Sequence, residues 1–214
     1  MNEVKFKQFL ESVDKNIWFH GDPNQREHFC DQRMDREAFV EDPNANGPGI
    51  YFTKDYTQAR GYAHPDGWVY TVRIDPDAGY VIKEDDEADD HKDFLFKLIK
   101  KAQAHNPETV YYAITDYGVE VMEVEDVTDE YIYYVIEEFI YTSTLIDAAV
   151  AIYKEFFGRE ANPWAQAMKD LGMLGFLQKQ PETDHLIVYN CEAIEILKEE
   201  KYVEDLTEAR NDVL

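Results

Sequence analysis

The sequence predicts an α+β fold: a split, mostly antiparallel β-sheet with a central cleft between its halves, and a helical insertion beside it. Short apolar runs of the kind that form strands occur near both ends of the chain. The middle of the chain instead carries apolar residues at helical spacing. An acidic run, residues 84–90, separates the two patterns. We therefore expect one domain over residues 1–214, with the insertion at about 84–170.

Before the insertion, the pattern predicts alternating helices and strands. An amphipathic helix is expected over residues 3–13, and a polar surface loop with a short helix near 25–29 is expected within 22–46. Asp55 is a candidate N-cap for a helix that continues to Ala63. The strands expected in this half are residues 17–19, 50–53 and 68–74.

Within and after the insertion, three helices and two strands are expected. Residues 91–105 and 129–157 have the apolar stripe of buried helices. Asn162 and Pro163 suit the start of a third helix, which Gly172 ends. The strands expected near the C-terminus are residues 186–189 and 193–197.

The composition indicates a chain that folds on its own in the cytoplasm. Of its 214 residues, 44% are hydrophobic, which is enough for a core. No run approaches the roughly 18 apolar residues that a membrane helix needs, so no membrane association is expected. The two cysteines, Cys30 and Cys191, form no CxxC motif, and we expect two reduced thiols.

The net charge of −24 argues against direct nucleic-acid binding, because the chain would repel a phosphate backbone. Three interpretations of this charge stay open. It is a solvated surface that maintains solubility, a face that recognises a basic protein, or a mimic of nucleic acid that occupies a DNA-binding surface.

The residues that point to chemistry lie in three short segments. Trp18-Phe19-His20-Gly21 ends the first expected strand, Gly49-Ile50-Tyr51-Phe52-Thr53 forms the second, and Tyr62 follows on the next helix, eleven residues after Tyr51. In order and spacing they resemble the histidine–tyrosine class of ADP-ribosyltransferases, the diphtheria-toxin and poly(ADP-ribose) polymerase type. The segment Leu186–Asn190 is similar to the closing strand of that family. The resemblance covers about residues 17–74 and 171–197, and phage-encoded transferases show a similar arrangement.

The resemblance implies a site for NAD, which these enzymes use as a substrate. Tyr51 and Tyr62 would sandwich the nicotinamide ring by stacking and cation–π attraction. Gly21 would let its backbone approach the carboxamide, and His20 would hydrogen-bond a ribose hydroxyl. The residues implied in NAD binding are His20, Gly21, Tyr51, Phe52, Thr53 and Tyr62.

The third catalytic residue departs from the family pattern. Alignment of the closing strand puts His185 where the family has a glutamate, and Glu182 and Asp184 precede it. A carboxylate near the ribose would stabilise the positive charge of an oxocarbenium-like transition state. Gln180-Pro181-Glu182 also resembles the Gln-x-Glu substrate-selecting loop of the arginine–serine–glutamate class, and Glu182 is favoured over Asp184. The candidate catalytic residues are Tyr51, Glu182, Asp184 and His185. With His185 in this position, elongation to poly(ADP-ribose) is not expected.

The function expected from these residues is NAD-dependent mono-ADP-ribosylation of a macromolecule, a protein target with a basic surface. Two alternatives stay open: an acidic inhibitor that blocks a basic nucleic-acid-binding protein, and an NAD glycohydrolase that uses water as acceptor. A phage-encoded effector of this kind would act in the host cytoplasm. No metal is expected, because the remaining histidines lack metal-ligand spacing, and no Walker, Rossmann or Gly-x-Ser-x-Gly motif is present.

Overall fold

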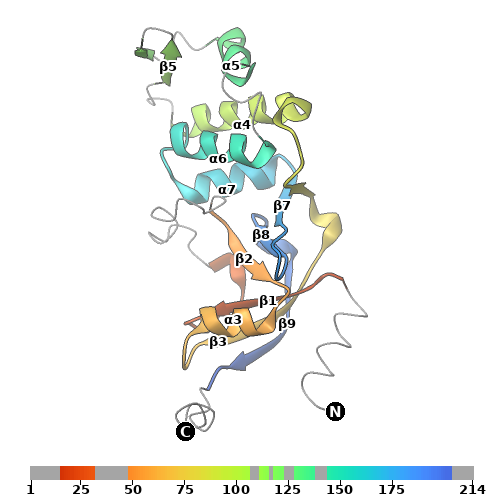
Figure 1. Ribbon diagram of the computed structural model, residues 1–214. Coiled ribbons are helices and arrows are strands. Elements are labelled where there is room, and N and C mark those ends of the chain that lie inside the picture. The colour runs from red at the N-terminus through yellow and green to blue at the C-terminus, as the bar shows by residue number, and fades with distance from the viewer. Residues whose placement is uncertain are drawn as a thin grey trace, which may run out of the picture.

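The computed structural model has mixed α+β architecture, with one large sheet and helices packed against it (Figure 1). It describes residues 15–31, 48–106, 111–115, 118–122, 128–137 and 144–203. The expected helix over 3–13 and much of the loop 22–46 lie outside these residues. Seven strands form the large sheet: β1 (Ile17–Asp22), β2 (Ile50–Thr53), β3 (Trp68–Ile74), β4 (Tyr80–Lys83), β7 (Met173–Gln178), β8 (His185–Val188) and β9 (Ile194–Lys201).

The sheet has the order β4-β7-β8-β2-β1-β3-β9 and is antiparallel except where β4 pairs with β7. Its two halves meet between β1 and β2. That junction is narrow, because the register of this strand pair contains only Phe19 opposite Thr53. On either side the pairing is extensive, with β1 matched to β3 along its whole length and β2 matched to β8. The mostly antiparallel sheet that the sequence predicted is confirmed.

The helix that follows β2, α3 (Tyr56–Ala63), covers the lower half of the sheet (Figure 1). Asp55 caps it as predicted, because its side chain accepts a hydrogen bond from the backbone N–H of Thr57 at 2.7 Å. Ala59 and Ala63 are buried against β1 and β3, together with Phe19. Small residues on this face let the helix backbone lie directly on the strands.

The region of the expected insertion contains a second group of helices, stacked above the other half of the sheet (Figure 1). These are α4 (Lys92–His105), α5 (Asp129–Val135), α6 (Leu145–Glu155) and α7 (Ala161–Asp170), with a hairpin of β5 (Tyr111–Thr115) and β6 (Gly118–Met122) between α4 and α5. Leu95, Leu98, Ile152 and Trp164 are among the apolar residues of their shared core. Among the described helices, none is long and apolar enough to cross a membrane.

Two of the expected helices have different boundaries in the structure. The stretch 129–157 is not one described helix, since α5 ends at Val135 and α6 begins at Leu145. Thr144 starts α6 with its own N-cap, where its hydroxyl accepts a hydrogen bond from the N–H of Asp147. Helix α7 begins two residues earlier than expected, with Glu160 rather than Asn162 at the N-cap position, and Gly172 follows its end with φ of 81°, as a C-terminal glycine does.

Strands β4 and β7 were not expected, and their parallel pairing explains why. β7 reads Met-Leu-Gly-Phe-Leu-Gln, a buried run without polar alternation, and β4 has four residues. Gly175 lies in β7 where a Cβ would overlap the backbone carbonyl oxygen of Ile187 on β8. Such a run cannot be distinguished by periodicity alone from a helix end.

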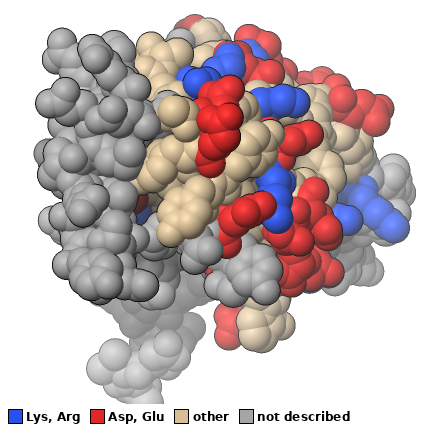
Figure 2. Space-filling model, turned by 90° about the horizontal axis from the view of Figure 1, so that it is seen from above, with Lys and Arg blue, Asp and Glu red and all other residues tan. Residues whose placement is uncertain are grey.

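The acidic run 84–90 is a largely exposed connection that makes specific local contacts. The Asp86 carboxylate accepts hydrogen bonds from the backbone N–H of Lys83 and from the Tyr80 hydroxyl, both at 2.8 Å. Burial and this carboxylate raise the pKa of Tyr80 to about 12. Asp89 pairs with Lys92 at 2.7 Å. Seen over the insertion helices, acidic side chains outnumber basic ones but are interspersed with them (Figure 2).

Cys30 and Cys191 form a disulfide, so the expectation of two reduced thiols is wrong. The bond joins two short 3₁₀ turns, η1 (Phe29–Asp31) and η6 (Cys191–Ala193), across 161 residues of sequence. Sequence spacing gave no sign of it, because the two turns are far apart in the sequence and meet only in the tertiary structure. Disulfides persist mainly in oxidising compartments, so the bond gives no support to the expected cytoplasmic location, which stays a prediction.

Reduction of the disulfide is expected to lower the free energy of unfolding by about 2–4 kcal/mol, because the bond restricts the unfolded chain over a long loop. Urea unfolding with and without a thiol reductant measures the change. The Cys30→Ser variant serves as the control and should not respond to the reductant. Two titratable thiols in the unfolded, unreduced protein, or identical urea midpoints, would contradict the assignment.

Candidate active site

The candidate site lies on the face of the sheet that α3 covers. Strands β2 and β8 pair here, with Thr53 opposite His185 and Tyr51 opposite Ile187. Directly paired residues point to the same face of a sheet, so the Tyr51, Thr53 and His185 side chains share one face. We give the name β2 trough to these three residues and the side of α3 that carries Gln58.

Gln58 shows which side of α3 faces the trough. Its amide oxygen lies 2.6 Å from the Thr53 hydroxyl oxygen and 2.7 Å from Nε2 of His185. Tyr62 is four residues further along the same helix, and residues at this spacing lie on one helix side. The side chain of Tyr62 is 57% exposed. Tyr62 therefore lies on the Gln58 side of α3, whereas Tyr51 lies on β2.

His185 is the titratable group of this polar cluster. Partial burial lowers the pKa of its imidazole, while the adjacent Asp184 carboxylate opposes that change. The imidazole is therefore mostly neutral at neutral pH. Thr53 also accepts a hydrogen bond from the backbone N–H of Asp55, which ties the cluster to the first turn of α3.

Tyr51 packs against the core of the insertion as well as lining the trough. Burial raises the pKa of the nearby Tyr189 well above its usual value, and electrostatic repulsion from Tyr51 raises it further. Tyr189 also packs edge-on against Trp164 at 4.8 Å between ring centroids. Within the described residues, its buried hydroxyl has no hydrogen-bond partner. Tyr51 is thus adjacent to an apolar core that contains one buried hydroxyl without a partner among the described residues.

His20 lies on the other face of the sheet. Its ring contacts Phe29, Phe52 and Tyr70, with ring centroids 5.0–6.3 Å apart. Its Nδ1 donates a hydrogen bond of 2.7 Å to the backbone carbonyl of Tyr51. This bond joins β1 to β2 beyond their single register pair, which is a structural reason for a histidine at the narrow junction.

A buried ion pair beside His20 was not anticipated from the sequence. Oδ2 of Asp22 lies 2.8 Å from Nε of Arg26 and 3.8 Å from Nε2 of His20. Burial opposes ionisation of Asp22, yet His20, Arg26 and the backbone N–H of Asn24 outweigh it and hold the pKa of this carboxyl far below its usual value. A D-x-x-x-R spacing after a strand is too common to have marked this pair.

Gly21 lies beneath α3 rather than beside an open space. A Cβ at this position would overlap the backbone carbonyl oxygen of Ala59 and would lie 2.6 Å from the backbone nitrogen of Ala63. Close packing of helix on strand therefore explains the glycine without a ligand. Phe52 belongs to the core on the His20 face.

Glu182 and Asp184 line a different feature, an open cleft of about 1320 Å³ that extends from the loop before β8 along α3 to the end of β9. Its walls carry four basic and four acidic residues, together with Trp18, Tyr56 and Tyr202. The charged lining residues are Lys15, Lys54, Arg60, Lys201, Asp55, Glu182, Asp184 and Glu200. Lys54 lies over the Trp18 ring, with Nζ 3.9 Å from its centroid.

The cleft and the trough meet at Thr183. This residue lines the cleft, and its hydroxyl oxygen lies 3.5 Å from that of Thr53 in the trough. The structure thus brings Tyr51, Thr53 and His185 together, with Tyr62 on the adjoining helix side. It puts Glu182 and Asp184 in the neighbouring cleft and His20 on the opposite face. Over the part of the chain that the structure describes, no group of three or more His, Cys, Asp or Glu residues is placed to hold a metal ion.

Comparison of the chain with models of known protein families, with curated proteins and with solved structures found no match.

Proposed function

We propose that this chain is an NAD-dependent mono-ADP-ribosyltransferase whose nicotinamide site is the β2 trough. The observation that supports the proposal is that Tyr51 of β2 shares a sheet face with His185, while His185 contacts Gln58 on the side of α3 that also carries Tyr62. Two aromatic faces held by two rigid elements suit a flat cationic ring. The resemblance of the sequence motifs to the histidine–tyrosine class supports the same assignment.

The neighbouring cleft fits the other half of such a reaction. An acceptor must reach the nicotinamide ribose from a direction that the dinucleotide leaves open, and the cleft meets the trough at Thr183. Its balanced charges and three aromatic rings suit a polypeptide better than a doubly charged pyrophosphate. The excess of acidic residues over the whole chain favours a protein target with a basic surface.

The carboxylates of the loop before β8 are the proposed electrostatic partners of the reaction. Departure of nicotinamide leaves positive charge on the ribose, which a nearby carboxylate stabilises. Glu182 is exposed in this loop and Asp184 is half-buried beside His185. We retain Glu182 as the first candidate and Asp184 as the second, because a loop side chain can turn toward bound NAD.

Loss of both tyrosines of the trough is expected to weaken NAD binding by about 2–4 kcal/mol, or roughly 30- to 900-fold, if each ring contributes stacking of the usual size. Isothermal calorimetry of the Tyr51→Ala, Tyr62→Ala variant against wild type measures this change. Tyr134→Ala is a matched control, since Tyr134 is a helical tyrosine that is 50% exposed and belongs to the insertion. A wild type that binds neither NAD nor nicotinamide would refute the pocket.

Incubation of the wild type with labelled NAD and a cell lysate distinguishes the three functions. Label on a protein supports transfer, whereas free ADP-ribose and nicotinamide alone indicate a glycohydrolase. Unchanged NAD, together with tight capture of a basic nucleic-acid-binding protein, would favour the acidic inhibitor. The mixed charges visible over the insertion give that last outcome no particular support (Figure 2).

A further inference from the structure

Two hydrogen-bond donors converge on a single acceptor at the end of the β2 trough. The Thr53 hydroxyl oxygen accepts a hydrogen bond from the backbone N–H of Asp55 at 3.0 Å. The same hydroxyl donates its hydrogen to Oε1 of Gln58, and the two oxygen atoms are 2.6 Å apart. Nε2 of His185 lies 2.7 Å from the same oxygen. An amide oxygen only accepts hydrogen bonds, so Nε2 of His185 must carry the hydrogen in this arrangement.

From this geometry we propose that Gln58 is a positioning residue that holds His185 as the Nε2–H tautomer, so that the unprotonated Nδ1 serves as the proton acceptor for an incoming hydroxyl group. The proposal rests on the transferase function proposed above. It assigns His185 the role of a proton acceptor, which differs from the charge-stabilising role of the glutamate that the family has at this position. An imidazole cannot stabilise a ribosyl cation as a carboxylate does, but a neutral imidazole is a good proton acceptor.

The proposed step is balanced without a further reactant. The hydroxyl oxygen of the acceptor forms a bond to C1′ of the nicotinamide ribose as the C1′–N bond breaks, and the electron pair of that bond goes to the nicotinamide ring, which leaves neutral. The hydroxyl proton passes to Nδ1 of His185, and the imidazolium later releases it to solvent. A base is useful only for an acceptor that carries a proton, so the inference specifies a hydroxyl-bearing acceptor over a carboxylate.

The alternative geometry has a distinct signature. If the Gln58 amide were turned by 180°, its NH₂ group would donate to Nε2 of His185 and the hydrogen would reside on Nδ1. ¹⁵N-resolved NMR of the histidine ring nitrogens separates the two tautomers without any need for enzymatic activity. We expect protonated Nε2 and unprotonated Nδ1 for His185 in the wild type.

Three variants test the role of Gln58. Gln58→Leu removes the acceptor at similar volume and should give a mixture of tautomers, with a roughly 10- to 100-fold loss of transfer rate and little change in the Kd for NAD. Gln58→Glu retains an acceptor oxygen and should restore the tautomer. Thr53→Val removes the other donor to Gln58, together with the acceptor of the Asp55 N–H, and should leave the tautomer of His185 unchanged.

Label transferred by the wild type identifies the acceptor. A bond to a side-chain hydroxyl survives neutral hydroxylamine, whereas an ester to a carboxylate is cleaved, and release of free ADP-ribose identifies water as the hydroxyl donor. An Nδ1–H tautomer in the wild type, or an unchanged tautomer in Gln58→Leu, overturns the positioning role of Gln58 even if the chain transfers ADP-ribose. An ester product overturns the base role of His185. The expected tautomer in a chain that does not consume NAD instead overturns the proposed function and the base role with it, while the positioning of His185 stands.

Discussion

Replacement of Asp22 by asparagine is expected to lower the free energy of unfolding by about 3–5 kcal/mol, the usual cost of removing one partner of a buried ion pair. The Asp22 side chain is 1% exposed and that of its partner Arg26 is 16% exposed, so the change leaves a poorly hydrated guanidinium without its counter-ion. Asparagine has nearly the same shape, which separates the loss of charge from a loss of packing. Chemical denaturation of both proteins at pH 7 gives the difference.

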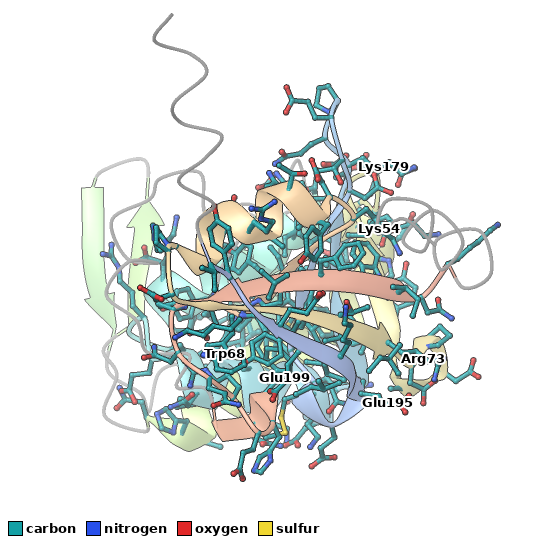
Figure 3. All side chains as sticks on the ribbon, turned by 90° about the horizontal axis from the view of Figure 1, so that it is seen from below. Lys54, Trp68, Arg73, Lys179, Glu195 and Glu199 are labelled. Atoms are coloured by element: carbon teal, nitrogen blue, oxygen red, sulfur yellow. A yellow bond between two sulfur atoms is a disulfide. The ribbon has the colours of Figure 1, made fainter. Side chains whose placement is uncertain are left out.

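Glu195→Gln is the matched control. Glu195 of β9 pairs with Arg73 of β3 at 2.9 Å, and the two side chains lie next to one another at the edge of the sheet (Figure 3). This pair has nearly the same nitrogen–oxygen separation as the Asp22–Arg26 contact, but its side chains are 46% and 62% exposed. Its loss should cost no more than about 1 kcal/mol. Equal effects of the two substitutions would show that burial does not strengthen the Asp22 pair.

The Asp22 pair also predicts a pH dependence of stability. The pKa of Asp22 is lowered in the folded state, so its contribution is fully present above the unfolded-state pKa, near 4, and declines as the pH falls below that value. Wild type and Asp22→Asn should therefore converge in stability as the pH falls from about 5 toward 2. A stability difference that stays constant over this range would contradict the assignment.

Substitution of Gly21 by valine is expected to lower the free energy of unfolding by about 3 kcal/mol or more. A side chain here meets the backbone of α3 at Ala59 and Ala63, and a backbone cannot turn aside as a flexible side chain can. The helix would have to move away from β1 and expose the small core that it shares with Phe19. Thermal and urea unfolding of the variant measure the loss.

Gly61 of the same helix provides the opposite expectation. No atom lies within 4 Å of a Cβ built at Gly61, and the residue is exposed. Gly61→Ala should therefore stabilise the protein by about 0.5–1 kcal/mol through helix propensity.

A Gly21→Val variant as stable as wild type would mean that α3 does not lie on β1 as described. Because Gly21 supports the fold, its substitution is not a clean test of NAD binding, and the tyrosine pair is the better one.

The local pattern of the sequence was enough to predict several elements near the candidate site. The alternation over residues 68–74 and the short run 50–53 became β3 and β2, and Asp55 capped α3 as expected. These features depend on the alternation of apolar and polar residues and on a cap two residues from its donor, so a short segment of sequence is enough to predict them. The sequence also singled out Tyr51 and His185, which the structure brings to one face of the sheet.

Other features were decided only by the tertiary structure. The Cys30–Cys191 bond spans 161 residues, and the pairing of β4 with β7 joins strands on either side of the insertion. The contact of His185 with Gln58 links residues 127 positions apart. Each depends on which surfaces meet when the sheet closes, and the energy of such a contact is set by burial and geometry rather than by residue type. The sequence alone therefore does not distinguish a cysteine, a glutamine or an aspartate on the surface from one that forms a long-range contact in the fold.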